Sequence, residues 1–532
     1  MPNFIPYDLN QSKMIVLNFH DQLQRGTFEH AINHLIENKL NLSVFDERYH
    51  NDENGRPAYD PAILLKIVLF AYSKGITSSR EIQWCCENNI IFKALSCETV
   101  PHYTTIAHFI SSHPIAIHEI FEQIVLTCYK EGLIGNELFA IDGCKLPSNA
   151  AKEWSGTLKE LTKKRKKIKE QLSQHMARHV ALDKQEASEV ASHLEKERTA
   201  KAIDTLNAAF DKITQFLETA EPRLGEGKRK TEVKSNITDN DSAKMGTSKG
   251  TIQGFNGLGA ADKLHQVIID AQAYGSGPEQ HTLKPIIEAI RDRFDRLDIP
   301  ADFTQDGTII TADTGFCNEK NMQYLKENHL NAYVPDTHFR SRDDKLKGQK
   351  EKHQHPNLNK SRAEKKVKKK KASVFPPSDF TFDVEKMTCQ CPAGEMLGQQ
   401  KRGKDNRGNQ KVFFTARQRQ CQACHLKKDC MRNPSAASQR NGRGRQVSFM
   451  LKKNESKDRY TDWMKQRIDT SKGRQIYSHR MSVIEPVFGN ISANKKLNRF
   501  SLRGKEKVQS QWQLYCMIHN IEKLMNYGEL AT

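Results

Sequence analysis

The chain has 532 residues, and at roughly 150 residues per domain this length predicts three to four structural units. Hydrophobic residues make up 37% and charged residues 28%, which excludes a collagen-like or a wholly disordered chain. Lys and Arg number 83 against 64 Asp and Glu. The resulting net charge of +19 favours a polyanionic partner, with nucleic acid ahead of a ribosome or an anionic membrane.

No membrane or secretory segment is expected. The most apolar stretch, residues 62–72, is interrupted by Lys66 and is shorter than the roughly 20 residues of a spanning helix. Residues 1–14 have no basic segment followed by an apolar core, so no signal peptide is expected. The scattered cysteines are therefore predicted to be reduced thiols in a cytosol. They are Cys85, Cys86, Cys97, Cys128, Cys144, Cys317 and Cys516.

The first 135 residues predict an all-α domain. Residues 64–76 are apolar on more than one face, as in a buried helix. The pair Ser78–Ser79 can cap the next helix, and Thr104–Thr105 can cap a third. Short helices joined by capped turns are typical of a helix-turn-helix unit that presents its last helix to DNA. The alternative is a helical bundle that packs against the rest of the protein.

After residue 135 the hydrophobic pattern predicts strands that alternate with helices. Helices are predicted at residues 285–294 and 320–328, and a glycine-rich turn is predicted at residues 254–260. Strands are predicted at residues 137–143, 265–275, 308–315 and 329–336. This alternation predicts an α/β core.

Two segments are predicted to interrupt that core. Residues 157–221 predict an inserted helical hairpin with its break near residues 182–183, because apolar residues recur at steps of three and four in its second half. Its basic first half is interpreted as solvated surface, with DNA contact as the alternative. Residues 340–373 are rich in lysine and poor in apolar residues, which predicts a mobile linker with non-specific affinity for phosphate. Helices are expected again from about residue 460.

Three acids stand out by their position. Asp142 and Asp313 end predicted strands, and Glu485 lies in a predicted helix. Three carboxylates that converge suit Mg²⁺, and two such ions can promote an in-line phosphoryl displacement. The alternative is that Asp142 and Asp313 only cap turns.

Blocks of the sequence, in order, resemble a bacterial insertion-sequence transposase of the DDE type with an N-terminal helical module. They are residues 59–82 with 100–109, then 140–152, 254–287, 311–325 and 479–525. The resemblance implies a ribonuclease-H-like catalytic core, two Mg²⁺ or Mn²⁺ ions, and DNA cleavage followed by strand transfer. It also implies that Asp142, Asp313 and Glu485 are the catalytic, metal-binding residues.

The last helix departs from the family pattern. Related transposases carry a Tyr, Arg, Glu and Lys series there, and Tyr477 and Arg480 have the expected mutual spacing. However, Ile484 stands where the series puts Glu, and Ser492 stands where it puts Lys. The Glu-Pro-Val-Phe-Gly context favours Glu485 as the third acid. The residues predicted to contact DNA are Arg480, Lys495 and Lys496, with an ordinary surface Arg as the alternative for Arg480.

Five cysteines cluster between the second Asp and the Glu. They are Cys389, Cys391, Cys421, Cys424 and Cys430. Two thiolate pairs about 30 residues apart can supply a tetrahedral structural zinc site. Which four would bind is left open, His425 is a sixth candidate, and unmetallated thiols are the alternative. A closed thiolate site has no open position, so this zinc would not be catalytic.

Together these features predict five parts. They are an N-terminal helical DNA-binding module (1–135), a ribonuclease-H-like core (136–155, 246–340 and 455–528), a helical hairpin (156–235), a basic linker (341–375) and a cysteine-rich insertion (376–454). The expected partners are the element's terminal repeats, target DNA and further copies of the chain, in the bacterial cytoplasm at the nucleoid. The rival hypotheses are a decayed DNA-binding protein and a metal-dependent nuclease that does not join strands.

Overall fold

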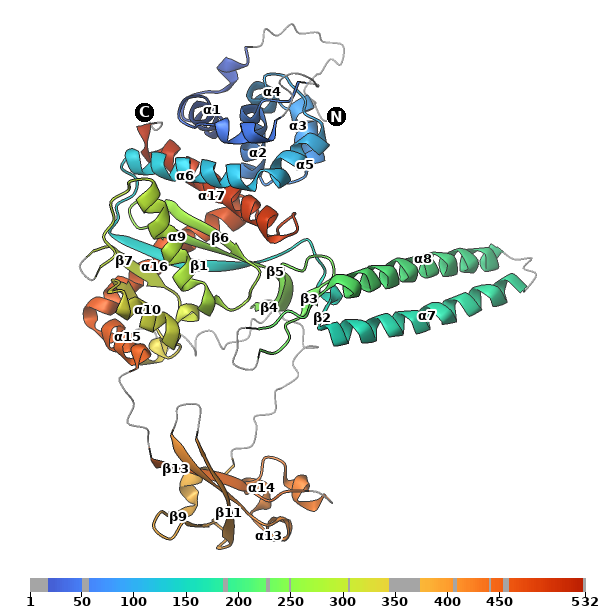
Figure 1. Ribbon diagram of the computed structural model, residues 1–532, viewed down its shortest axis with the longest axis vertical. Coiled ribbons are helices and arrows are strands. Elements are labelled where there is room, and N and C mark those ends of the chain that lie inside the picture. Colours follow the sequence, from blue (N-terminus) through green and yellow to red (C-terminus); the bar gives the residue numbers. More distant parts are fainter. Residues whose placement is uncertain are drawn as a thin grey trace, which may run out of the picture. The chain divides into compact units, whose positions relative to one another are not determined.

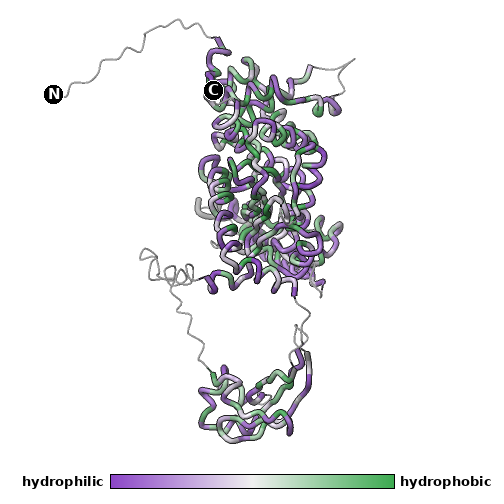
Figure 2. Tube along the Cα trace, turned by 90° about the vertical axis from the view of Figure 1, so that its left-hand side faces the viewer, coloured by the Kyte–Doolittle hydropathy of each residue, from purple (hydrophilic) through white to green (hydrophobic). Residues whose placement is uncertain are grey.

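The structure, a computed structural model, describes residues 18–49, 57–184, 190–225, 230–247, 250–304, 307–343, 374–404, 409–439, 442–452 and 459–529. The chain forms two compact units, Met1–Phe339 with Met464–Thr532 (the main unit) and Arg340–Trp463 (the small unit) (Figure 1). Among the described residues no helix is long and apolar enough to cross a membrane. Figure 2 shows hydrophobic positions mixed with hydrophilic ones in both units.

The N-terminal part is helical, as predicted. Its helices are α1 (Phe28–Asn38), α2 (Pro61–Ser73), α3 (Ser79–Asn88), α4 (Ile90–Leu95), α5 (Tyr103–Ser112) and α6 (Pro114–Lys130). Helix α2 is buried from Leu64 to Ser73, so it is the core helix expected from its apolar composition. The predicted cap of α5 is wrong. That helix begins one residue before Thr104, because the ring of His102 accepts the Thr104 N–H.

A mixed sheet forms the centre of the main unit. Its strands are β4 (Ala243–Thr247), β5 (Gly250–Asp262), β1 (Leu138–Pro147), β7 (Ile309–Ala312) and β8 (Ala332–Tyr333), and β6 (Ile268–Tyr274) also pairs with β5. Strand β1 is antiparallel to β5 and parallel to β7, and β8 is parallel to β7. Helix α9 (Leu283–Arg296) joins β6 to β7, and α10 (Glu319–Glu327) joins β7 to β8. The predicted α/β class is confirmed.

The glycine-rich turn predicted at residues 254–260 is wrong, because these residues lie inside β5, the longest strand of the sheet. Their glycines allow close approach of other elements. A Cβ on Gly257 would stand 3.1 Å from the ring of Trp512, and one on Gly254 would stand 2.0 Å from the Leu146 carbonyl oxygen. Trp512 cannot retreat easily, since it is fully buried and its indole N–H donates to the Leu258 carbonyl at 2.8 Å.

Helix α17 (Lys505–Tyr527) joins the N-terminal helices to the sheet. Its residues are buried almost without interruption from Ser510 to Ile521, and it packs against α6, α2 and β6. Two of its amides cover the open edge of β6. Asn520 exchanges hydrogen bonds with both backbone groups of Ile268 at 2.8 Å, and Gln509 bonds the backbone of Ala271 and Ala273 at 2.7 and 2.6 Å. The edge strand therefore keeps its polar backbone groups paired.

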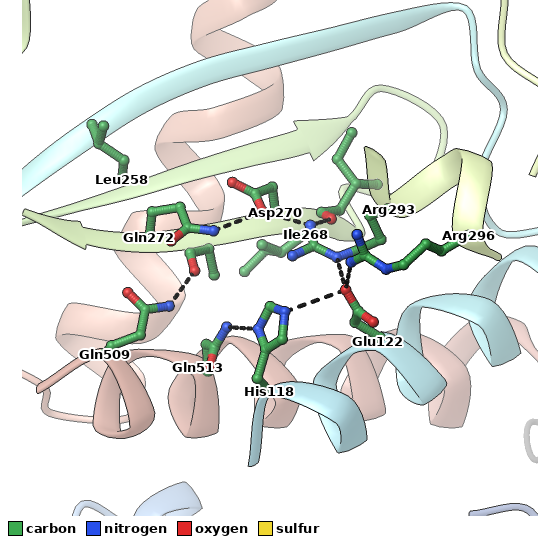
Figure 3. Close-up of polar contacts among 12 residues, drawn as sticks. His118, Glu122, Leu258, Ile268, Asp270, Gln272, Arg293, Arg296, Gln509 and Gln513 are labelled. Carbon is green, nitrogen blue, oxygen red and sulfur yellow. Dashed lines mark hydrogen bonds and ion pairs between the residues drawn. The ribbon is translucent and has the colours of Figure 1, made fainter. Parts of the chain in front are cut away.

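A charged network ties α6 and α9 to β6 (Figure 3). Arg293 is 1% exposed and pairs with Asp270, which is fully buried. The Arg293 Nε also lies 3.1 Å from Glu122 on α6, whose carboxylate pairs with Arg296 and lies 3.3 Å from the His118 ring. Each charged group of this network thus has an opposite charge beside it.

The predicted helical hairpin is present. It consists of α7 (Leu158–Lys184) and α8 (Val190–Thr219), and the short antiparallel pair β2 (Ser155–Gly156) and β3 (Ser235–Asn236) closes its base. Helix α7 extends to Lys184, one residue past the predicted break at residues 182–183. Leu161, Ile168 and Ile213 form the buried contact between the helices.

The small unit contains a five-stranded antiparallel sheet. Its order is β13 (Gln446–Lys452), β12 (Gln410–Thr415), β11 (Met396–Lys404), β10 (Thr388–Gln390) and β9 (Thr381–Asp383), accompanied by α13 (Gln418–Gln422) and α14 (Lys427–Cys430). Most of the basic tract predicted as a linker, residues 344–373, lies outside the described residues. Among the described residues, the other α-helices are α11 (Phe339–Arg342), α15 (Tyr460–Asp469) and α16 (Ser471–Gly489), of which α16 belongs to the main unit.

Candidate active site

Asp142 and Asp313 lie side by side because neighbouring parallel strands carry them. Ile141 of β1 is the register partner of Ala312 of β7, and each aspartate is the next residue. The side chains are 20% and 34% exposed, so both carboxylates can be reached from solvent. Two strands that are distant in sequence thus bring two of the three predicted acids together.

Arg480 of α16 bridges the two aspartates. Its Nη1 lies 2.7 Å from Asp142 Oδ2, and its Nη2 lies 3.6 Å from Asp313 Oδ1. The Tyr477 hydroxyl, one helical turn earlier, donates to Asp313 Oδ1 at 3.4 Å. Arg480 is only 4% exposed, so it is not an ordinary surface arginine. The spacing of three residues places Tyr477 and Arg480 on the same side of α16, where both contact the carboxylates.

Burial and neighbouring charges shift the pKa values of Asp142 and Arg480 in opposite directions. Burial raises the pKa of Asp142 above its ordinary value, although Arg480 and the Gly143 N–H oppose the rise. Burial alone would lower the pKa of Arg480, but Tyr477, Asp142 and Asp313 hold it above its usual value. Arg480 is therefore a permanent cation. Its Nε is buried and has no hydrogen-bond partner within the described residues, so the guanidinium is not fully satisfied by the aspartates.

Glu485 does not join the two aspartates in the structure. It follows Arg480 by five positions, which at about 100° per residue turns it away from the side of α16 that faces the sheet. Glu485 is exposed, whereas Ile484 is fully buried. Within the ranges that the structure describes, no group of three or more His, Cys, Asp or Glu side chains is positioned to hold a metal ion.

Helix α16 is weakened directly after Glu485. Pro486 lies inside the helix and cannot donate to the Ser482 carbonyl, which instead accepts a hydrogen bond from the Gln266 side chain at 3.0 Å. A π-helical turn, Asn490–Asn494, follows the helix. The backbone around Glu485 is therefore held by fewer helical hydrogen bonds than the turn that carries Arg480.

The two lysines predicted to contact DNA have different surroundings. Lys495 is buried, pairs with Glu522 and lies 5.7 Å from the centre of the Phe28 ring. Lys496 is exposed, and its side chain packs over Gly75, where no Cβ intervenes. Only Lys496 is accessible to a phosphate as the chain stands.

One neighbouring acid was missed by sequence reasoning. Glu279 is 13% exposed on its side chain, lies 3.4 Å from Lys145 Nζ and packs beside Gly315, two residues after Asp313. Asn256 donates to it at 3.3 Å. Its position in a single 3-10 turn (Glu279–His281) before α9 gives no periodic signal, and this turn approaches the site only in the folded chain.

The clustered cysteines divide into two groups. Cys391, Cys421, Cys424 and Cys430 line one cavity of the small unit. Cys389 instead lies in β10, fully buried against the apolar core. His425 does not line that cavity.

Two family models match the chain. One, described as a transposase DDE domain, matches residues 390–525, and the other, described as a transposase domain (DUF772), matches residues 17–112. The first match contains Arg480, Glu485 and the four cysteines of the cavity, whereas Asp142 and Asp313 lie outside both matches. A search of curated proteins finds no match.

Proposed function

The two family matches indicate an insertion-sequence DDE transposase, and on this premise we propose that the chain cuts DNA at the ends of its element and joins the freed ends to target DNA. The observation that carries the proposal is the pair Asp142 and Asp313, which directly follow the last parallel register pair of β1 and β7 and are bridged by Arg480. Paired carboxylates beside a fixed cation suit phosphoryl transfer, in which positioning and charge supply most of the catalysis.

The strand order supports a ribonuclease-H-like core. Written by position in the sheet, β6-β5-β1-β7-β8 has three antiparallel strands followed by two parallel ones, with helices α9 and α10 as crossovers. We assign the core to residues 136–155, 246–340 and 455–528. The N-terminal helices and the basic surface would hold DNA, including the terminal repeats, and pairing two element ends would need more than one copy of the chain.

The donor chemistry fits a hard divalent cation. Asp142 and Asp313 offer solvent-accessible carboxylate oxygens of the kind that Mg²⁺ or Mn²⁺ takes, and Glu485 would be the third ligand. When bound, two such ions would activate the attacking oxygen and neutralise charge on the leaving oxygen. Asp142, with its raised pKa, must be ionised to bind them.

Arg480 would bind the DNA phosphate at the cleavage point. Its fork of donors matches two phosphate oxygens, and the phosphate would reach it once a metal ion takes over the charge of the two aspartates. In the absence of a divalent cation it compensates the two aspartates. Tyr477 would keep the guanidinium in place, since the ring centre lies 5.6 Å from the guanidinium carbon.

Glu485 would reach the aspartates through a bend in α16. The missing hydrogen bond at Pro486 lowers the cost of such a bend, and DNA binding would supply the free energy for it. The exposure of Glu485 also favours a second candidate function, a DNA-binding relic that no longer cuts.

The test is a cleavage and joining assay with the DNA that flanks the reading frame, in Mg²⁺ or Mn²⁺. Wild type should give excised and joined products, and Asp142→Asn, Asp313→Asn and Glu485→Gln should each bind DNA but give none. Asp462→Asn, an exposed acid on α15, is the matched control and should retain activity.

Each other outcome has a distinct meaning. An active Glu485→Gln variant would show that the third ligand is another residue. Cut but unjoined DNA in wild type would indicate a nuclease. Binding without any cutting by wild type would indicate the relic.

A further inference from the structure

Four cysteines that are distant in sequence surround one small cavity of the small unit. Cys391, Cys421, Cys424 and Cys430 line a cavity of about 30 Å³, which is room for a single ion or water. Cys391 opens a tight turn in which the Gly394 N–H donates to the Cys391 carbonyl at 2.8 Å. The other three come from α13, α14 and the loop between them.

The surroundings of this cavity suit negatively charged sulfur. The Arg445 backbone N–H points at Cys421 Sγ at 3.3 Å, and Arg445 and Lys427 both line the cavity. The Arg445 Nε is buried and finds no hydrogen-bond partner among the described residues. A buried cationic donor without an acceptor is costly, and thiolates in the cavity would provide one.

The small unit also needs an additional source of stability. Its apolar core cluster has eight buried residues, two of which are cysteines. A core of this size supplies little net free energy, and small domains commonly add a metal or disulfides. All of these cysteines are unpaired in the structure, so no disulfide supplies it.

We propose that the small unit binds one structural zinc ion through Cys391, Cys421, Cys424 and Cys430, and that Cys389 and His425 are not ligands. Cys389 is excluded because it does not line the cavity and lies within β10, between its register partners on β9 and β11. The thiols are not yet at the spacing of a bound metal in the described residues. Binding would draw them together as Zn²⁺ replaces the thiol protons, which pass to solvent.

The test measures zinc per chain in the full-length protein, purified with zinc and desalted, by elemental mass spectrometry. One zinc per chain is expected for wild type and for the controls Cys389→Ala and His425→Ala. Each of Cys391→Ser, Cys421→Ser, Cys424→Ser and Cys430→Ser should weaken zinc affinity at least about 100-fold, the upper range for loss of a supporting residue.

Cobalt substitution separates loss of a ligand from failure to fold. Wild type and both controls should bind Co²⁺ with the intense visible absorption of a tetrahedral thiolate site, and a chelator should remove it while sensitising residues 374–452 to protease. Zinc-free wild type with four free thiols or disulfides at these positions would overturn the proposal. Zinc retained in the four serine variants, or lost equally in the Cys389→Ala variant, would also overturn it.

Discussion

Arg480 is the residue on which the charge balance of the candidate site depends. It is the cation that directly bridges Asp142 and Asp313, and it is buried. A guanidinium in this place and a bound divalent cation would compensate the same carboxylates. Arg480 and the metal are therefore linked by electrostatics even if they never touch.

Removing that cation gives a first prediction. Arg480→Ala should lower the free energy of unfolding by about 1–3 kcal/mol without metal, less than for a fully buried pair because both aspartates are partly exposed. Mg²⁺ should stabilise the variant more than it stabilises wild type, because the metal replaces the lost charge. Urea unfolding with and without Mg²⁺ measures both effects. Lys472→Ala, exposed on the same helix, is the control, and an equal response to Mg²⁺ in both proteins would contradict the prediction.

Glu122 gives a second prediction, on pH. Burial opposes its ionisation, but the His118 hydrogen bond and the charge of Arg293 lower the pKa of Glu122 to about 2 from 4.5. A carboxyl whose folded pKa is depressed contributes stability above its unfolded pKa and loses it as pH falls through the folded value. The contribution is about 3 kcal/mol, and it should disappear between pH 4.5 and about 2.

The measurement is the free energy of unfolding at several values between pH 5 and pH 3. In the Glu122→Gln variant the free energy of unfolding should fall less steeply with decreasing pH than in wild type, because the variant has no carboxyl to protonate at this position. Glu119→Gln, on the same helix, should decline as wild type does. Parallel curves for Glu122→Gln and wild type would show that the network does not depress this pKa.

At the scale of elements, side chains of α17 form the hydrogen bonds to the edge of β6 that a neighbouring strand would form. Asn520 supplies one acceptor and one donor to Ile268, as a neighbouring strand would. A helix can do this only where a side-chain amide lies level with the backbone N–H and carbonyl of one strand residue, as Asn520 does with Ile268. The sequence of α17 does not reveal this role, because asparagine and glutamine are usually exposed, whereas Asn520 is fully buried.

A third prediction follows for this helix. Asn520→Ala should lower the free energy of unfolding by about 1–3 kcal/mol, because it leaves two buried backbone groups unpaired. Hydrogen exchange should show the Ile268 amide opening more often. Asn526→Ala, an exposed asparagine on the same helix, should change stability by less than about 0.5 kcal/mol. Equal protection of Ile268 in both variants would mean that the edge is covered in another way.

At the scale of the whole molecule, the hairpin α7–α8 enters and leaves the main unit at one point. The pairs Ser155 with Asn236 and Gly156 with Ser235 bring its two ends into register. Its internal contact, Leu161, Ile168 and Ile213, belongs to the hairpin itself. The sheet that carries Asp142 and Asp313 does not include any residue of either helix.

A fourth prediction is that this hairpin can be removed. Replacing residues 158–233 with a short glycine-serine loop should leave the unfolding temperature of the main unit within about 5 °C of wild type. If the basic first half of α7 contacts DNA, affinity should fall and the dependence of binding on salt should become less steep. Calorimetry and binding at several salt concentrations measure these effects. Loss of folding would show that the hairpin stabilises the sheet.

The element pattern was largely readable from the sequence. The strands at β1, β6, β7 and β8, the helices between them and the hairpin follow from hydrophobic period, which depends on local geometry alone. Strand β5 was not predicted, because a segment rich in glycine is typical of a turn. Gly257 leaves room for Trp512, more than 250 residues later, and Gly254 leaves room for the backbone of Leu146.

The sequence by itself determined the α/β class, the helical N-terminal part and the position of Asp313 directly after a strand, because each is set by neighbours along the chain. The predicted strand end at Asp142 is wrong, because β1 stays paired with β5 as far as Pro147. The tertiary structure alone decided that these aspartates meet, that Arg480 bridges them and that Ile484 rather than Glu485 faces the sheet. It also placed four of the five clustered cysteines, and not Cys389, around one cavity. The direction and burial of a side chain depend on segments that reach it only in the folded chain.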